Sequence, residues 1–174
     1  YLKILKQSGP AEFNSFELDT NRTITAVRFS PDNKLIAVGA VDGTITTWAT
    51  DKQDKYRHSI KCDAEIVGLQ FVPNTNLLVA GCISGDVHVI DCEKSKFTGH
   101  MAIKGRGACQ SVATNSHGHL AAIFRAADGT YASVFDLATG RPITGELSNG
   151  TTLNSVRFSH DGTQIICTPG KDGN

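Results

Sequence analysis

One sequence pattern recurs four times along this chain of 174 residues, at intervals of roughly 43 residues. The copies begin at Ile24, Ile66, Cys109 and Leu153. Apolar anchors recur at the equivalent positions Val27, Leu69, Val112 and Val156. A repeat of this length is one supersecondary unit that cannot bury its apolar surface alone, so neighbouring copies must stack. We therefore expect function to lie on a surface that several repeats build together.

The spacing of turns within one copy predicts antiparallel β-strands. In the first copy, Ile24–Ser30 carries the β-branched and aromatic residues of a strand, and a turn follows at Pro31-Asp32-Asn33. Leu35–Ala40 is a continuous apolar run, as in a strand that is buried on both faces. Asp42-Gly43 predicts a tight hairpin turn. Further strands are expected at Thr44–Thr50 and Tyr56–Ile60. Short strands at this spacing, with almost no helical periodicity, predict an all-β fold built from four-stranded blades, a β-propeller.

Residues at the ends of the third strands resemble those of the WD-repeat β-propeller family. The Trp-Asp pair of that family is partly kept at Trp48, at Ile90-Asp91 and at Phe135-Asp136. Its Gly-His pair occurs once, at Gly99-His100. The resemblance covers residues 24–174. It implies four-stranded antiparallel blades that commonly form a seven-bladed ring, of which this chain would supply about four blades.

The repeat boundaries predict a single propeller domain made of successive blades. The expected units are residues 1–23 (outer strands of a preceding blade), 24–61, 62–103 and 104–148 (three blades), and 149–174 (inner strands of a following, incomplete blade). Two arrangements remain open at this point. The chain is part of a larger ring, or the strands at its two ends pair with each other and close a four-bladed ring. The wedge shape of blades in the resembled family favours the larger ring.

Charge balance and cysteine content limit the class of partner and the cellular setting. The 17 basic residues equal the 17 acidic residues in number, which disfavours nucleic acid as a direct ligand because a phosphate-binding face needs clustered Lys and Arg. No apolar run approaches the ~18 residues of a membrane-spanning helix, so we expect no membrane partner. The 5 cysteines form no CxxC pair, which favours reduced, buried thiols and an intracellular protein, cytoplasmic or nuclear.

An acidic residue recurs at the second hairpin turn of each repeat. These residues are Asp42, Asp86, Asp128 and Asp172. Their repetition indicates structural turns, because a catalytic residue is needed once and a structural one in every blade. The resemblance implies that such an aspartate is bonded to a tryptophan on the third strand, a role that Trp48 would have for Asp42.

Charged residues on the loops between blades are candidates for binding a protein or peptide at the top rim of the propeller. We predict Arg22, Glu65, Lys104, Arg106 and Arg125 as partner-binding residues. Arg125 stands out because its sister positions in the other repeats carry no charge. A salt bridge between Arg125 and Asp128 is the structural alternative.

Two kinds of residue invite a chemical interpretation, and each has a simpler structural one. His117-Gly118-His119 could contribute to a metal site, but it falls at a hairpin turn with no further ligand fixed beside it. Cys82, Cys109 and Cys167 fall in or beside predicted strands, where thiols pack as core residues. We therefore predict no catalytic residue, no metal and no cofactor.

The resemblance favours a non-catalytic scaffold for protein–protein interaction, working within a multiprotein complex. The alternative is a propeller enzyme of the lactonase-like hydrolase type, with a site in the central channel near His100 and Glu65. A third alternative, the substrate-gating propeller of a serine peptidase, requires an attached hydrolase domain. A propeller fold by itself does not choose among these functions.

Overall fold

The computed structural model describes residues 2–9, 12–18, 21–50, 56–94, 96–148 and 150–170, of which residues 2–9, 12–18, 56–57, 97–102 and 104 are described by their strand positions. Within these ranges, fifteen strands form five antiparallel sheets, and every regular element is a strand. The all-β prediction is therefore confirmed. None of the described residues belongs to a helix with the length and apolar character needed for crossing a membrane.

Each sheet consists of strands that are consecutive in the chain and joined by hairpins. The first sheet contains β1 (Leu2–Gly9) and β2 (Glu12–Leu18). The second contains β3 (Ile24–Phe29), β4 (Leu35–Ala40), β5 (Thr44–Ala49) and β6 (Tyr56–Lys61). The third contains β7 (Ile66–Phe71), β8 (Leu77–Cys82), β9 (Asp86–Asp91) and β10 (Lys96–Lys104). The fourth contains β11 (Ala108–Thr114), β12 (His119–Ala126) and β13 (Gly129–Asp136), and the last contains β14 (Leu153–Phe158) and β15 (Ile165–Pro169).

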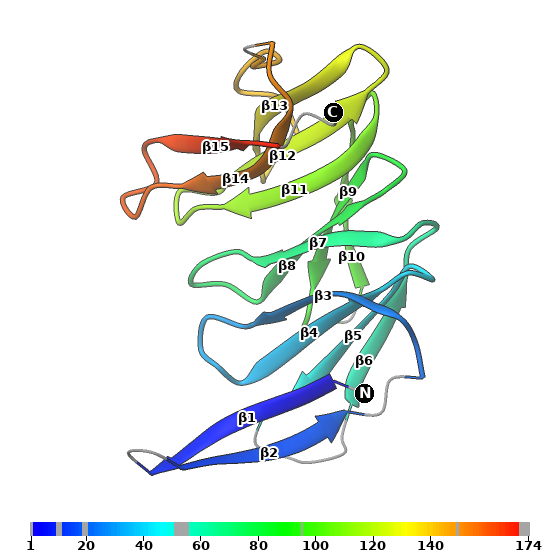
Figure 1. The fold of residues 1–174 in the computed structure, drawn as a ribbon, viewed down its shortest axis with the longest axis vertical. Helices are drawn as coiled ribbons and strands as arrows, with labels where there is room; N and C mark the ends of the chain where they lie inside the picture. The colour runs from blue at the N-terminus through cyan, green and yellow to red at the C-terminus, as the bar shows by residue number, and fades with distance from the viewer. Residues whose placement is uncertain are drawn as a thin grey trace.

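The sheets stack in chain order, from β1–β2 at the bottom of Figure 1 to β14–β15 at the top. The first strands of neighbouring sheets face one another, so that β3 packs on β7, β7 on β11 and β11 on β14. The strands β1–β2 and β14–β15 form two separate sheets at opposite ends of this stack. The described strands therefore do not adopt the alternative arrangement, in which the two ends of the chain would pair to close a four-bladed ring.

The second strand of each complete blade lies in the core because neighbouring sheets cover both of its faces. Every residue of β4 is buried, and β8 and β12 are buried over most of their length. The apolar runs in the sequence predicted this burial. β15 differs, since Ile166 is 64% exposed. No described sheet covers the far side of β15 (Figure 1).

The fourth strand expected in the 104–148 blade is replaced by an irregular outer segment, residues 142–147. This segment follows β13 through two isolated bridges, Ala132 with Leu147 and Phe135 with Pro142. Between the bridges, the Thr144 hydroxyl accepts the backbone N–H of Val134 at 3.0 Å. A side chain thus takes the place of a main-chain acceptor, and Pro142 has no N–H to donate to a ladder. The predicted strand is present only as this partial pairing.

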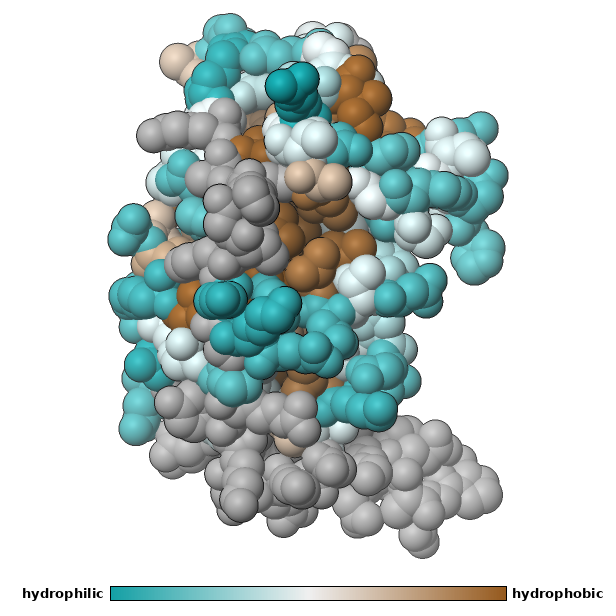
Figure 2. Space-filling view, turned by 180° about the vertical axis from the view of Figure 1, so that it is seen from behind, coloured by the Kyte–Doolittle hydropathy of each residue, from teal (hydrophilic) through white to brown (hydrophobic). Residues whose placement is uncertain are grey.

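Apolar side chains reach the surface at the turns and on the outer side of the stack. Figure 2 shows them gathered through the middle and upper part of the rear face, between hydrophilic areas. Among the residues whose side chains are described, the exposed large hydrophobic ones are Phe29, Val41, Ile83, Ile143, Leu147 and Ile166. Val41 and Ile83 occupy equivalent second turns of two blades, next to charged residues that are described below.

Candidate interaction rim

One edge of the stack is built from the connections between sheets and the second hairpin turns. We call this edge the rim and define it as residues 21–23, 41–43, 62–65, 83–85, 105–107 and 127–128. In the first complete blade, the Val41 N–H donates to the Thr23 carbonyl and the Cys62 N–H donates to the Gly43 carbonyl, each at 2.9 Å. Equivalent bonds join Ile83 to Glu65 and Gly105 to Gly85 in the next blade. The rim is therefore held by the same backbone hydrogen bonds from one blade to the next.

Glycine is required at the second turns because the chain approaches itself closely there. Gly43 has φ +82° and Gly85 has φ +92°, in the left-handed region that favours glycine. A Cβ on Gly43 would lie 2.4 Å from the carbonyl oxygen of Cys62. The Asp-Gly pair in the sequence therefore marks the turn, and its glycine also permits the close contact with the connection to the next sheet.

The carboxylate of Asp42 holds the second turn of the first complete blade and gathers two cations. It accepts hydrogen bonds from the N–H and the hydroxyl of Thr44, both at 2.9 Å. Its Oδ2 also lies 3.1 Å from Arg22 Nε and 3.3 Å from Lys61 Nζ. The Thr44 N–H, together with these cations, holds the pKa of Asp42 well below its usual range. The structure therefore brings the predicted partner-binding Arg22 and the predicted turn residue Asp42 together.

Trp48 does not occupy the place that the resemblance implied for it. The indole Nε1 donates to Thr46 Oγ1 at 3.3 Å, whereas the Asp42 carboxylate is engaged by Arg22, Thr44 and Lys61. Trp48 pairs with Ile36, near the end of β5 that is remote from the Asp42 turn. Trp48 lies four positions beyond Thr44 along the strand, roughly 13 Å at 3.3 Å per residue. The tryptophan is therefore too far along the strand to bond to Asp42.

Arg106 is the centre of the most strongly connected charged group on the rim. Its Nε and Nη2 donate to the two oxygens of Glu146, both at 2.7 Å. Its Nη1 donates to Asp128 at 2.7 Å. The guanidinium lies over the Tyr131 ring, 4.8 Å from the centroid, and the Arg106 backbone N–H donates to the Tyr131 hydroxyl at 2.8 Å. Backbone and side chain of Arg106 are thus fixed by the same aromatic residue.

The opposite charges of Arg106, Glu146 and Asp128 stabilise the ionised forms of all three side chains. The carboxylates of Glu146 and Asp128 raise the pKa of the Arg106 guanidinium, and Arg106 in turn lowers the pKa of each carboxyl group. Tyr131 is supported from below by Phe124, which is fully buried and stacks on it at 5.3 Å between ring centroids. The result is a pre-oriented cation at the surface. Glu146 was not predicted, because it lies on the irregular outer segment, 40 residues from Arg106.

Arg125 does not form the alternative salt bridge to Asp128, because Asp128 is taken by Arg106. It faces Gln110 on the neighbouring strand β11. With the Gln110 amide oxygen turned toward it, that oxygen accepts from Arg125 Nε at 2.7 Å and from Nη2 at 2.9 Å. The Gln110 amide nitrogen then donates to the Leu153 carbonyl at 3.1 Å. Arg125 is therefore linked through Gln110 to the first residue of β14.

The other predicted binding and turn residues have simpler surroundings. Glu65 is half-buried and accepts the Ile83 N–H through its backbone carbonyl. Asp86 accepts a hydrogen bond from the Ser84 hydroxyl at 2.7 Å. Lys104 is the last residue of β10, and its side chain lies outside the described residues, as does the whole of Asp172. Their predicted roles stay predictions.

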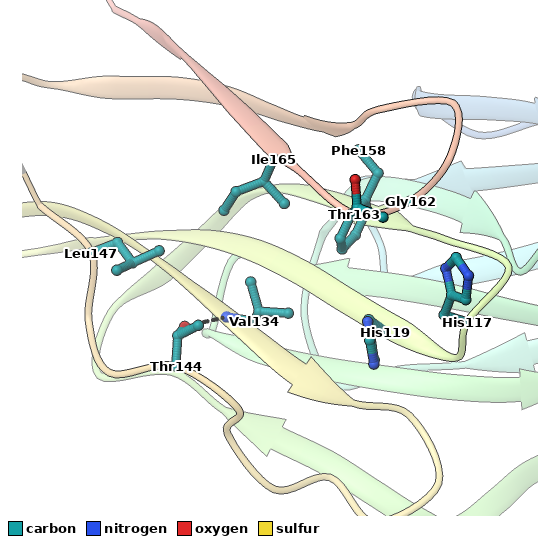
Figure 3. A pocket seen from close by; sticks show the side chains of 9 residues that line it. All are labelled: His117, His119, Val134, Thr144, Leu147, Phe158, Gly162, Thr163 and Ile165. Atoms are coloured by element: carbon teal, nitrogen blue, oxygen red, sulfur yellow. Dashed lines mark hydrogen bonds between the residues drawn. The ribbon is translucent and has the colours of Figure 1, made fainter.

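The opposite edge of the stack carries the His117-Gly118-His119 turn, beside a groove of about 460 Å³ (Figure 3). Asn115 organises this turn, because its Oδ1 accepts the N–H groups of His117 and His119 at 3.0 and 2.9 Å. Its amide also donates to the Gly162 carbonyl at 2.9 Å, which ties the turn to the next sheet. Among the described residues, no third His, Cys, Asp or Glu joins the two histidines in a cluster of metal-ligand type.

The cysteines are free thiols, and four of the five are buried. Burial raises the pKa of Cys92 and of Cys109 to about 12, so both remain protonated at neutral pH. The thiols of Cys62 and Cys82 lie close together, and their interaction lowers the pKa of Cys62 and raises that of Cys82. His100, which was considered for the central-channel site of an enzyme, has its side chain outside the described residues.

Comparison with known proteins assigns the chain to a family. Residues 3–97, more than half of the 174 residues, match the family described as Regulator of MON1-CCZ1 complex, N-terminal. The chain belongs to this family.

The chain is also similar to a curated protein and to a solved structure. The small ribosomal subunit protein RACK1 of Neurospora crassa is 35% identical over 88 residues, which cover 48% of this chain and 27% of that protein. The chain thus spans about a quarter of the length of this relative. The crystal structure of the computationally designed Ika4 protein matches with a TM-score of 0.74 over 90% of both chains at 21% identity, a likeness of fold alone. The repeat, the stacked sheets and these matches together identify a WD-repeat β-propeller.

Proposed function

We propose that this chain is a non-catalytic interaction scaffold that binds a protein partner through its rim. The observation that carries the proposal is the Arg106 group, a cation held by Glu146, Asp128 and Tyr131 on an exposed edge. Arginine in a fixed orientation is well suited to contacts with carboxylates and backbone carbonyls of a partner. Exposed Val41 and Ile83 on the same rim would add apolar contact area.

The family description supports a protein complex as the partner. It names regulation of the MON1-CCZ1 complex, and the RACK1 relative is named as a ribosomal subunit protein. Both names describe proteins that work in multiprotein assemblies. We therefore propose the MON1-CCZ1 complex as the first partner to be tested. The free thiols and the RACK1 relative also support an intracellular setting.

The test is a binding titration of purified MON1-CCZ1 complex against the immobilised protein and three variants. Arg106→Ala removes the cation, and Arg106→Lys keeps the charge but loses the bidentate contact with Glu146. Lys34→Ala is the matched control, because Lys34 is an exposed cation in the β3–β4 turn, on the opposite edge of the blade.

We expect Arg106→Ala to weaken binding by at least tenfold, about 1.4 kcal/mol, because truncating a central arginine of an interface commonly costs this much. Lys34→Ala should bind as the parent protein does. Equal affinities for Arg106→Ala and the parent protein would contradict the rim location. No binding by the parent protein would refute the proposed partner.

A further inference from the structure

Two cysteines and a histidine converge at the interface between the second and third sheets. The Sγ atoms of Cys62 and Cys82 and one ring nitrogen of His88 all lie within 4.8 Å of one another. Cys62 and Cys82 are 2% and 1% exposed, and His88 is half-buried. Among the described residues, this is the one group of three His, Cys, Asp or Glu side chains with such spacing.

The β8–β9 hairpin places two of these side chains on one face. Ala80 pairs with His88, and Cys82 lies two residues beyond Ala80 on the same strand. Because side chains alternate along a strand, Cys82 and His88 are diagonal neighbours on the same face of the sheet. That face packs against the preceding blade, in a core cluster that contains Cys82, Cys62 and Ile66.

The third side chain comes from the preceding blade. Cys62 follows β6 directly, and its N–H is bonded to the Gly43 carbonyl at 2.9 Å. This bond fixes the connection between the sheets where it passes the β8–β9 hairpin. Figure 1 shows the sheets that contain β6 and β8–β9 lying next to each other in the stack. The cluster therefore lies between two blades, with Cys62 from one blade and Cys82 and His88 from the next.

The same positions in the other blades carry no such ligands. By the strand register, His88 corresponds to Thr46 and to Ser133. Cys82 corresponds to Ala40 and to Phe124, which pair with Ile24 and Cys109 as Cys82 pairs with Ile66. A residue required by the blade fold would recur in every copy, as the second-turn glycines do. These three metal-ligand side chains occur together in one blade interface, so the needs of the blade fold do not explain them.

We propose that Cys62, Cys82 and His88 bind a single zinc ion between these two blades. This function is separate from partner binding at the rim. Two thiolates and one imidazole are ligands that zinc prefers. Tetrahedral geometry with Zn–S bonds of about 2.3 Å and Zn–N bonds of about 2.0 Å puts the donor atoms roughly 3.5–3.8 Å apart. The observed spacing within 4.8 Å requires only small side-chain movements to reach this geometry.

The three side chains leave one position of a tetrahedral site for a fourth ligand. Asp86 begins β9, two residues before His88, and side chains two apart on a strand point to the same face. Its carboxylate, or a water molecule, would complete the coordination. On binding, the two thiols release their protons to the solvent, and the ion links the β6–β7 connection to the β8–β9 hairpin. The bound ion would stabilise this interface in the manner of a structural zinc site.

The experiment uses the reduced, chelator-treated protein and Co²⁺ as a spectroscopic probe. Co²⁺ bound to cysteine gives thiolate-to-metal charge-transfer absorption, and we expect this band to saturate at one equivalent. Zn²⁺ added afterwards should displace the cobalt and remove the band. Thermal unfolding followed in parallel should show a higher Tm with Zn²⁺ than without it, because the ion binds the folded state.

Three variants identify the ligands. Cys82→Ser and His88→Asn should each weaken Co²⁺ binding by at least about tenfold, and each should abolish the Zn²⁺-dependent rise in Tm. Cys109→Ser is the matched control, since Cys109 is a buried thiol at the next blade interface, outside the cluster. It should bind Co²⁺ as the parent protein does.

The measurement on the parent protein does not depend on whether the variants fold. Absence of a charge-transfer band in the folded, reduced parent protein would overturn the proposal. A band that persists unchanged in Cys82→Ser would also overturn it, by locating the metal elsewhere. Isolation of a Cys62–Cys82 disulfide, with no Co²⁺ binding after reduction, would reassign the pair to thiol oxidation.

Discussion

Replacing Tyr131 by Phe tests how the rim loop that carries Arg106 is held in place. The substitution removes one hydroxyl and keeps the ring beneath the Arg106 guanidinium. The hydroxyl is the acceptor of the Arg106 backbone N–H at 2.8 Å, and Tyr131 is 5% exposed. An ordinary hydrogen bond contributes about 0.5–1.5 kcal/mol, and a buried donor left without a partner costs about 1–3 kcal/mol. Because water can partly reach the exposed loop at Arg106, we expect a loss of about 1 kcal/mol.

Urea unfolding followed by circular dichroism measures this loss as a lower midpoint with an unchanged slope. For a chain of this size, about 1 kcal/mol also lowers Tm by roughly 2–4 °C. Tyr131→Leu is the comparison variant. It additionally removes the stacking on Phe124 and the ring beneath Arg106, so we expect a further loss of about 1 kcal/mol. An unchanged midpoint for Tyr131→Phe, or equal midpoints for the two variants, would refute this account of the loop.

Three further predictions concern single residues of the first complete blade. The Thr47 hydroxyl is buried without a hydrogen-bond partner. Thr47→Val should therefore raise the free energy of unfolding, measured in urea, by about 1 kcal/mol. A lower urea midpoint for Thr47→Val than for Thr47→Ser would contradict this. Gly43→Ala should be more destabilising than Gly118→Ala in thermal unfolding. Both glycines have a positive φ, but of the two only Gly43 would place its new Cβ against the backbone, 2.4 Å from the carbonyl oxygen of Cys62. Asp42 has a folded-state pKa below its ordinary 3.8, so its contribution to stability is complete above about pH 4 and is lost as the pH falls further. Asp42→Asn should therefore flatten the fall in unfolding midpoint between about pH 4 and pH 2, and an equally steep fall would argue against this linkage.

The hairpin pattern of the sequence predicted the strands closely because hairpins depend on local chemistry. In the first complete blade, Leu35–Ala40 was expected as a doubly buried strand and is β4, buried along its whole length. Asp42-Gly43 was expected as the following turn, and Gly43 has the positive φ that such a turn needs. The prediction was weaker for the 104–148 blade, where Pro142 and the Thr144 side chain replace regular pairing of the outer strand.

The candidate rim was predicted as a set of loops, but the partners of its charged residues were not. Arg106 was expected on a loop between blades, and the structure fixes it on Tyr131 and pairs it with Glu146. Arg125 was weighed as a partner of Asp128 and is bonded to Gln110. Such choices depend on which of several nearby groups has the right direction and distance, and charge type alone does not specify this.

The sequence by itself determined the repeat, the strand order within each blade and the turns that join them, because these follow from alternation of apolar residues and from backbone preferences over a few positions. The register of the β8–β9 hairpin places Cys82 and His88 on one face. Only the tertiary structure brought Cys62 to them from the preceding blade, and Glu146 to Arg106 across 40 residues. The Cys62 contact depends on how one twisted sheet is rotated against the next, and that rotation is the outcome of packing both faces of every blade at once. The Glu146 contact depends on the path of the outer segment beside β13.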